Sequence, residues 1–392
     1  MDGPYITDRG MRRPGAVTSA AGSCCYVIDH GGGVGLWPHV VGKARLLHFI
    51  GASVTVQRDG WVDHLSERIR AESGYDHALL KNAMGGVGMV FGLANYRQPP
   101  LTRSACVAFI EFSTGDLNGL KPVDHLPGLL RRLMNCCVQD HAHTVVVHNW
   151  RADQPSDDRL GIRRIYNEVA AEFGIPVIRN DVFATERLGD EPTLQEHWFR
   201  DVCHTHPPGA AAYAQHVVEA LKAIDGDDPV TARAAPLVDV DRVGFVGGFE
   251  TLASTDLARR VDYVYQGTGE VFPGLDLPGS HSVRLVADGE LMSVAFLSGP
   301  RSCWVEMSID GRPVRKFRCF DRNSHYERYI LLPAFFTLSN SIIEFASTSD
   351  KVDVSIASKP HPDFALPRRM TLVHLAGLRM HIRDLALLKT ES

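Results

Sequence analysis

The sequence predicts an α/β protein of two domains: a three-layer α/β/α domain built on a parallel sheet, followed by an all-β sandwich or jelly-roll domain. The chain has 392 residues, which is long for a single core. Between residues 43 and 225, short apolar runs alternate with amphipathic stretches, the pattern of strand–helix–strand units. After residue 240 the helical period fades and Asp-Gly pairs indicate hairpins.

Five short apolar runs are the predicted strands of the first domain. In chain order they are ARLLHFIGAS, HALLKNAM, ACVAFIEFST, HTVVVHNW and IPVIRNDVF. Helices are expected at residues 61–73, 126–138, 163–174 and 208–224. Because crossover helices make such a sheet parallel and cover both of its faces, ligands are expected beyond the carboxyl ends of the strands. The side chains that follow each strand are therefore the first candidates for a site.

Composition divides the chain into four parts. Residues 1–42 are interpreted as an N-terminal extension, 43–225 as the α/β domain, 226–240 as a linker rich in Asp, Ala and Pro, and 241–392 as a β-rich accessory domain. In the accessory domain, hairpin turns are expected at Asp288-Gly289 and at Asp310-Gly311. Further strands are expected in YERYILLPAFF, SIIEFAS and VDVSIAS.

The bulk composition disfavours several classes of partner. The formal net charge is −5 and no Lys/Arg cluster stands out, so no nucleic-acid partner is expected. There is no apolar run of 18 residues and no convincing signal peptide, which predicts no membrane partner and a cytoplasmic location. The eight cysteines form no regular disulfide framework, which favours a reducing compartment. The HGGGVG stretch lacks the Lys-Ser/Thr of a phosphate loop, and no cofactor is expected.

Ser53 lies in FIGASVT, at the end of the first predicted strand. Taken alone, Gly-x-Ser after a strand is typical of a turn or a helix cap. A serine hydroxyl becomes a nucleophile only when a base removes its proton and a third group orients that base. Asp201 and His204, three residues apart just before the last helix, can supply the acid and the base. His206 is an alternative base, but the spacing from Asp201 favours His204.

The order of these residues resembles the SGNH/GDSL hydrolases over residues 44–224. Ser53 in GAS stands where that family has its Gly-Asp-Ser motif, and DVCH matches the last block, which supplies the acid and the base. KNAMGGVG and EFSTGDLN take the second and third blocks. The resemblance implies a catalytic triad of Ser53, His204 and Asp201, and an oxyanion hole made by the N–H groups of Ser53 and of Gly85 or Gly86.

Two positions depart from the pattern of that family. Ala52 stands in place of the Asp before the nucleophile, and Gly115 stands where the third block has an Asn that donates to the oxyanion. Asn118 is nearby but out of register, and the loss of one oxyanion donor costs ~10²–10³-fold in turnover. Asp116, Asn118 and His148 follow the third and fourth strands and are the remaining candidate pocket residues. For His148 a hydrogen-bonded structural role is the alternative.

Other reactive side chains have simpler interpretations. The pairs His204/His206 and His141/His143 are of a type that binds zinc, and Asp140 adds one more carboxylate, but no ligand set is completed and no metal is expected. Cys203 is interpreted as a small buried side chain rather than a thiol nucleophile. In the second domain, five aromatic residues could stack on sugar rings or fill the core, and their strand spacing favours the core. They are Trp304, Tyr326, Tyr329, Phe335 and Phe336.

The resemblance predicts a serine-dependent hydrolase that cleaves O-acyl esters, acetyl esters in particular, through an acyl-enzyme. A β-sandwich beside such a domain resembles the modular esterases that act on glycans, so the expected partner is an acylated small molecule or glycan. Two alternatives stay open. One is an O-acyltransferase of polysaccharide biosynthesis that uses the same triad. The other is a glycan-binding protein of weak activity, which Ala52 and Gly115 would suit.

Overall fold

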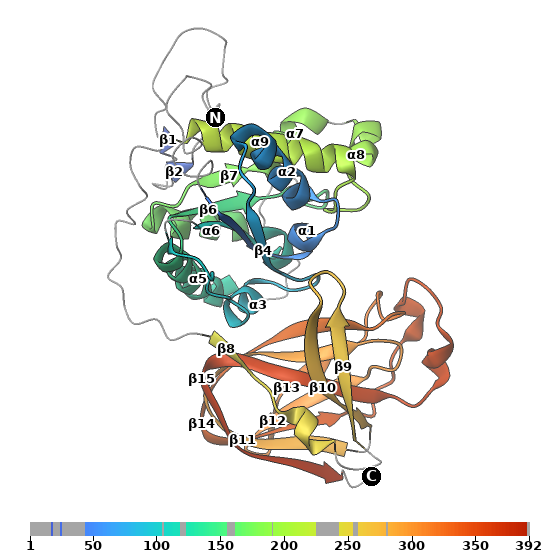
Figure 1. The fold of residues 1–392 in the computed structure, drawn as a ribbon. Helices are drawn as coiled ribbons and strands as arrows, with labels where there is room; N and C mark the ends of the chain where they lie inside the picture. The colour runs from blue at the N-terminus through green and yellow to red at the C-terminus, as the bar shows by residue number, and fades with distance from the viewer. Residues whose placement is uncertain are drawn as a thin grey trace, which may run out of the picture.

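The computed structural model describes residues 17–18, 24–25, 44–103, 106–117, 123–154, 161–189, 191–224, 243–253, 258–279 and 281–389. Within them the chain forms an α/β domain followed by a β domain (Figure 1). The predicted linker and the HGGGVG stretch lie outside the described residues. Of the predicted extension, only two paired strands are described, β1 (Val17–Thr18) and β2 (Cys24–Cys25).

The α/β domain contains the five predicted strands in one parallel sheet of order β4-β3-β5-β6-β7. The strands are β3 (Leu46–Gly51), β4 (Ala78–Ala83), β5 (Cys106–Glu111), β6 (His143–His148) and β7 (Val177–Arg179). Every residue of β3, β5 and β6 is buried, as continuous apolar runs predict for a sheet covered on both faces. The chain reverses its winding direction between β3 and β5, so the ligand crevice of this fold lies at their carboxyl ends.

Helices cover both faces of the sheet, which gives the predicted three layers. One face carries α2 (Trp61–Ser73), α7 (Asn180–Leu188), α8 (Pro192–Trp198) and α9 (Pro207–Ala223). The other carries α3 (Met89–Ala94), α5 (Leu126–Asp140) and α6 (Ile162–Glu172). The shorter helices α1 (Ser53–Val56), α4 (Ser113–Asp116) and η3 (Val123–His125) complete the domain. Among the described helices, none is both long and apolar enough to cross a lipid bilayer.

One predicted strand of this domain is partly wrong. The run IPVIRNDVF forms a strand only at Val177–Arg179, and helix α7 begins at Asn180. Asp181 lies in the first turn of that helix, where a negative charge is stabilised by the helix dipole. Helix α8 was not predicted, although Pro192 at its start is a typical signal for the first turn of a helix.

The β domain is built on a single eight-stranded antiparallel sheet of order β13-β12-β14-β11-β15-β10-β9, with β8 paired to β15. Its strands are β8 (Val243–Val246), β9 (Arg259–Tyr265), β10 (Glu270–Pro278), β11 (His281–Ser298), β12 (Trp304–Ile309), β13 (Arg312–Arg318), β14 (Arg328–Ser347) and β15 (Arg369–Lys389). Bulges interrupt the long strands, which curl around an apolar core (Figure 1). Three 3₁₀ turns accompany the sheet: η4 (Phe249–Leu252), η5 (Val354–Ile356) and η6 (Pro362–Ala365).

The two Asp-Gly signals have different outcomes. Asp310 and Gly311 have φ values of 51° and 74° and join β12 to β13, so this hairpin is confirmed. The hairpin at Asp288-Gly289 is wrong, because β11 runs through it with a bulge. Gly289 has a φ of 111°, and a Cβ there would lie 2.5 Å from the carbonyl oxygen of Arg379 on β15. The strand expected in VDVSIAS is also wrong, since this segment forms η5.

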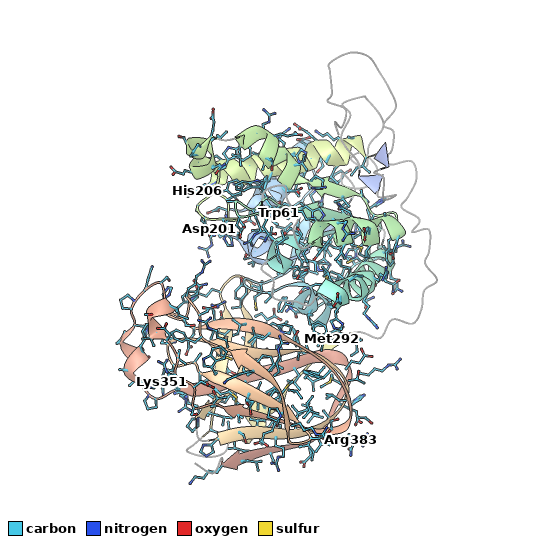
Figure 2. All side chains as sticks on the ribbon, turned by 180° about the vertical axis from the view of Figure 1, so that it is seen from behind. Trp61, Asp201, His206, Met292, Lys351 and Arg383 are labelled. Atoms are coloured by element: carbon cyan, nitrogen blue, oxygen red, sulfur yellow. The ribbon has the colours of Figure 1, made fainter. Side chains whose placement is uncertain are left out.

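The two domains share one apolar core. Phe91 of α3 is fully buried, and its ring centroid lies 6.0 Å from that of Phe245 and 6.1 Å from that of Tyr329, both in the β domain. Figure 2 shows Met292, a member of the same cluster, where the two domains meet. At the edge of the contact, Glu270 of β10 accepts hydrogen bonds from two side chains after α3. They are Asn95, at 3.2 Å, and Arg97, at 2.8 Å.

Replacing Phe91 by Ala should destabilise both domains together. The large-to-small change leaves a void between α3 and the β sheet and is expected to cost ~3–5 kcal/mol of unfolding free energy. Chemical unfolding followed by circular dichroism measures the change, and wild type should show a single transition. Val314→Ala, at a site 38% exposed on β13, is the control and should shift stability by less than about 0.5 kcal/mol. Two separate wild-type transitions, with only one sensitive to Phe91, would contradict a shared core.

Candidate active site

Ser53 is the first residue of α1 and follows β3 through a sharp turn. A Cβ at Gly51 would lie 2.2 Å from Thr55 Oγ1 and 2.6 Å from the carbonyl oxygen of Glu111, so only glycine fits there. The N–H of Ser53 lies at the start of a helix and has no acceptor within it. The half-buried Ser53 is therefore presented at the carboxyl edge of the sheet with a backbone donor beside its hydroxyl.

A buried carboxyl group at the end of β5 holds this turn in place through hydrogen bonds. Glu111, the last residue of β5, accepts hydrogen bonds from Thr55 Oγ1 at 3.1 Å and from the N–H and Oγ1 of Thr114 at 3.2 and 2.7 Å. Its backbone oxygen accepts the N–H of Ala52 at 3.0 Å. Complete burial raises the pKa of Glu111 to about 7, although the threonine hydrogen bonds oppose this shift. Glu111 thus ties the helix that Ser53 begins to the loop after β5.

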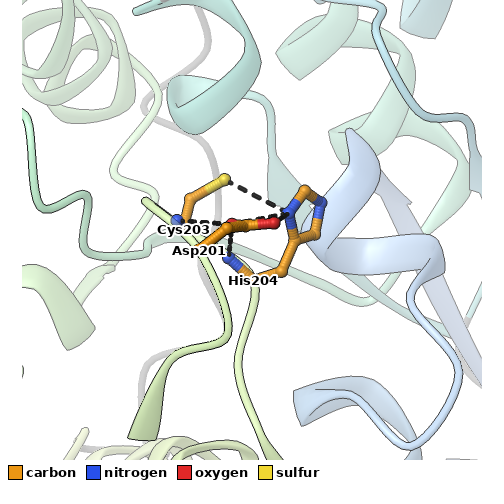
Figure 3. A group of neighbouring side chains, drawn as sticks. All are labelled: Asp201, Cys203 and His204. Carbon is orange, nitrogen blue, oxygen red and sulfur yellow. Dashed lines mark hydrogen bonds and ion pairs between the residues drawn. The ribbon is translucent and has the colours of Figure 1, made fainter. Parts of the chain in front are cut away.

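Asp201 and His204 form the acid–histidine pair that their spacing predicts. His204 Nδ1 lies 2.9 and 2.8 Å from the two carboxylate oxygens of Asp201, which also accepts the N–H groups of Cys203 and His204 at 3.0 and 2.8 Å. Figure 3 shows the Asp201 carboxylate and the Cys203 sulfur on the Nδ1 side of the ring. Partial burial acts to raise the pKa of Asp201, but these hydrogen bonds outweigh it and hold that pKa well below its usual range. A carboxylate on Nδ1 fixes the tautomer that leaves Nε2 as the basic nitrogen.

A pair of hydrogen bonds fastens the loop that carries His204 to the end of α1. Gln57 Nε2 donates to the carbonyl of Thr205 at 2.7 Å, and the N–H of Thr205 donates to Gln57 Oε1 at 3.2 Å. Gln57 follows α1 directly, and Thr205 follows His204. The clamp therefore brings the helix that Ser53 begins and the loop that carries His204 together. Among the described residues, no hydrogen bond joins Ser53 to His204, so their catalytic contact stays a prediction; such contacts are often long in ligand-free enzymes.

Gly85 of the predicted oxyanion loop lies beside Ser53. A Cβ at Gly85 would lie 3.7 Å from Ser53 Cβ. The Gly85 N–H donates to the hydroxyl of Tyr265 at 2.9 Å, and Arg328 Nη1 lies 3.3 Å from where a Cβ would stand at Gly86. Tyr265 and Arg328 belong to the β domain and were missed from the sequence.

The third-block position has no room for an Asn. A Cβ at Gly115 would lie 2.4 Å from the carbonyl oxygen of Val87 and 3.0 Å from Ala52 Cβ. The departure from the family pattern is therefore built into the packing of this loop, and the missing donor cannot be restored at this position without moving the backbone of Val87.

The other predicted pocket residues have structural partners. Asp116 is buried and accepts hydrogen bonds from the N–H of Met89 at 3.1 Å and from Tyr166 Oη at 2.6 Å, which fixes the start of α3. His148 is fully buried with Nε2 3.0 Å from Asn167 Oδ1, and burial lowers its pKa to about 3. Asn118 lies outside the described residues.

The remaining histidines lie in other surroundings. His206 is exposed and precedes α9 as its N-cap residue. His141 is buried, and its Nε2 lies 3.0 Å from Nδ1 of His48.

Asp201, Cys203 and His204 also offer three potential metal-ligand atoms within 4.8 Å of one another. A thiol binds zinc as a thiolate. In the metal-free protein, burial first of all, and then the charge of Asp201, raises the pKa of Cys203 to about 12. The carboxylate of Asp201 is taken up by three N–H groups. The geometry therefore favours an acid–histidine pair over a metal centre.

No protein-family model matches the chain, and a search of curated proteins gives no match. Among solved structures, it is similar to a two-domain esterase active on acetylated mannans, with a TM-score of 0.58 and 15% identity over 86% of this chain and 92% of that one. The structure of such an esterase crystallised with mannopentaose gives a TM-score of 0.59 and 15% identity over 94% and 100% of the two chains. These likenesses confirm the expected fold, a three-layer α/β/α domain followed by an all-β domain.

Glu111 should make stability fall as the pH rises. Its pKa is about 7 in the folded protein against 4.5 for an ordinary glutamate, so its contribution is complete below about pH 4.5 and is lost as the pH rises through about 7. Glu111→Gln should remove up to about 1.4 kcal/mol per pH unit from this slope between about pH 4.5 and 7, as measured by urea unfolding. Glu168→Gln, whose side chain is 42% exposed, is the control. Equal slopes in wild type and Glu111→Gln would refute the shifted pKa.

Proposed function

We propose that this protein is a serine-dependent esterase that removes O-acyl groups, acetyl groups in particular, from a carbohydrate. The observation that carries the proposal is the Asp201–His204 pair, held by the Gln57–Thr205 clamp against the helix that Ser53 begins. A nucleophile, a base and an orienting carboxylate are the three groups that acyl transfer from an ester requires.

In the first step, His204 Nε2 takes the proton of Ser53 Oγ as the oxygen attacks the ester carbonyl. The new Oγ–C bond forms while the π electrons of the carbonyl move onto its oxygen, which accepts hydrogen bonds at the Ser53 and Gly85 end of the site. Asp201 stabilises the imidazolium that results. The tetrahedral intermediate then collapses, the C–O bond to the sugar breaks, and His204 gives its proton to the departing sugar oxygen.

In the second step, water repeats the sequence on the acyl-enzyme. His204 removes a proton from water, the hydroxyl adds to the acyl carbon, and the bond to Ser53 Oγ breaks as Oγ recovers the proton. The products are a carboxylic acid and the free enzyme. If a sugar hydroxyl replaced water, the same residues would carry out acyl transfer, so the fate of the acyl group distinguishes the esterase from the transferase.

A carbohydrate substrate is supported by the two-domain likeness and by one exposed aromatic side chain. The similar esterase is described as active on acetylated mannans. Of the five aromatic residues considered for sugar stacking, Tyr326 is 50% exposed, whereas Tyr329 is buried and Phe335 stacks on His125 with centroids 4.1 Å apart. Burial is the main cause that raises the pKa of Tyr265, and Tyr263 and Tyr326 add smaller contributions. An exposed aromatic side chain on the domain that packs on α1 suits a sugar ring.

Ser53→Ala should abolish activity toward p-nitrophenyl acetate. Loss of the nucleophile is expected to lower kcat by about 10⁴-fold or more, and to prevent covalent labelling by a fluorophosphonate. Ser66→Ala, a buried serine of α2, is the matched control and should retain both. Labelling of a serine other than Ser53, or full activity in Ser53→Ala, would refute the proposal. Transfer of the acyl group to an added oligosaccharide, in place of its release as acid, would select the transferase.

Tyr326→Ala should impair only the use of glycans. Loss of one stacking ring is expected to raise KM for acetylated mannan roughly tenfold, while kcat for p-nitrophenyl acetate stays at the wild-type value. Trp304→Ala is the control, because the side chains of Lys316 and Arg318 already lie over that ring on β12. It should leave the KM for acetylated mannan at the wild-type value. Equal KM values for wild type and Tyr326→Ala would remove Tyr326 from the binding site.

A further inference from the structure

The β domain places one hydroxyl group at the centre of the candidate active site. Tyr265 is the last residue of β9, and the turn from β9 to β10 reaches from the β domain toward α1 (Figure 1). In that turn, a Cβ at Gly267 would lie 2.8 Å from Val56 Cγ2 and 2.8 Å from the Tyr265 ring. The tip of the hairpin is thus packed on α1, and the tyrosine hydroxyl is fixed by its hydrogen bond with Gly85.

The hydroxyl and the nucleophile flank the same glycine. The position of a Cβ at Gly85 is 3.7 Å from Ser53 Cβ and 3.5 Å from Tyr265 Oη. The Gly85 N–H, one of the two glycine donors that the resemblance offers for the oxyanion, is already donated to that oxygen. The acceptor position in front of Gly85 is therefore occupied by Tyr265, and an oxyanion formed at Ser53 would meet the hydroxyl group there.

The Tyr265 hydroxyl is available as a hydrogen-bond donor. Its oxygen accepts from Gly85, and among the described residues no acceptor takes its O–H. Burial raises the pKa of Tyr265 to about 12, against the opposing effect of the Gly85 hydrogen bond, so the phenol keeps its proton at neutral pH. A hydroxyl whose oxygen accepts one hydrogen bond is polarised into a better donor for the next.

The site also lacks the third-block Asn, and a tyrosine hydroxyl could take the place of that missing donor. A side chain at Gly115 would collide with the carbonyl of Val87, so no Asn can reach the oxyanion from the third block. With the Gly85 N–H engaged by Tyr265, the candidate backbone donors that remain are the N–H groups of Ser53 and Gly86, and no side-chain donor comes from the third block. An oxyanion hole needs several donors preorganised around the developing charge.

We propose that Tyr265 is an oxyanion-hole donor supplied by the β domain, in the role that the third-block Asn has in the family; this rests on the proposed function. As Ser53 Oγ bonds to the carbonyl carbon, the π electrons move to the carbonyl oxygen, which accepts the Ser53 N–H and the Tyr265 O–H. Gly85 keeps its hydrogen bond to Tyr265 and so acts through it. The tyrosine proton is shared and not transferred, and it returns fully to the phenol when the intermediate collapses.

Tyr265→Phe removes the hydroxyl and keeps the ring on α1. With p-nitrophenyl acetate, kcat should fall ~10²–10³-fold while KM changes by less than about threefold, because the lost bond forms in the transition state. Labelling of Ser53 by a fluorophosphonate should slow in parallel, since charge develops on the phosphoryl oxygen in the same place. Tyr263→Phe is the matched control: it lies on the same strand, its hydroxyl has a backbone hydrogen bond with Tyr329, and kcat should not change.

The outcomes separate the two proposals. An unchanged kcat in Tyr265→Phe, with activity lost in Ser53→Ala, would overturn the donor role and leave the esterase proposal standing. A raised kcat in Tyr265→Phe would also overturn it, because the hydroxyl would then be a block in the oxyanion hole. A rise in KM alone would assign Tyr265 to ground-state binding and refute the donor role. Activity retained in Ser53→Ala would overturn both proposals.

Discussion

The apolar contact between α3 and the β sheet is the constraint on which the site depends. Phe91 is buried among aromatic rings of the second domain, so the two domains cannot separate without exposing a large apolar surface. The hairpin tip on α1 is held by the same packing. The Tyr265 side chain is therefore held within hydrogen-bond distance of Gly85, in the loop beside Ser53, and the entropy cost of positioning it is met during folding. The β domain in this sense contributes a side chain to the candidate active site.

Two carboxyl groups at this edge of the sheet have opposite electrostatic environments. Asp201 is half-exposed and accepts three N–H groups, so it stays ionised and can balance an imidazolium. Glu111 is enclosed, and its hydrogen bonds come from uncharged threonines, so its charged form is disfavoured up to about pH 7. The first group suits a role in charge stabilisation, and the second suits a role in fixing backbone position. The sequence alone would not distinguish the two carboxyl groups, because burial and hydrogen bonding decide the difference between their pKa values.

The parts that could be predicted from the sequence are those encoded locally. The buried strands, the amphipathic helices and the Asp201–His204 pair each depend on residues a few positions apart. The failed hairpin depends on a distant partner: Asp288-Gly289 forms a bulge because β15 passes against Gly289. The confirmed hairpin has open space at its glycine, since a Cβ at Gly311 would have no atom within 4 Å. Glu111 offered a signal, a lone carboxylate closing an apolar run. Gln57 and Tyr265 offered none, since their partners are 148 and 180 residues away in the chain.

The two departures from the family pattern are one structural feature. Ala52 Cβ lies 3.0 Å from where a Cβ would stand at Gly115, so a small residue at either position is matched by a small residue at the other. The loop after β5 then packs directly on the turn before Ser53, and the space for an Asn side chain is lost to backbone contact with Val87. If the site had only lost function, nothing would require another donor to take up that role. Instead, a protonated hydroxyl from the second domain accepts a hydrogen bond from Gly85, a glycine that the resemblance offers for the oxyanion hole, which favours replacement of the missing donor over decay of the site.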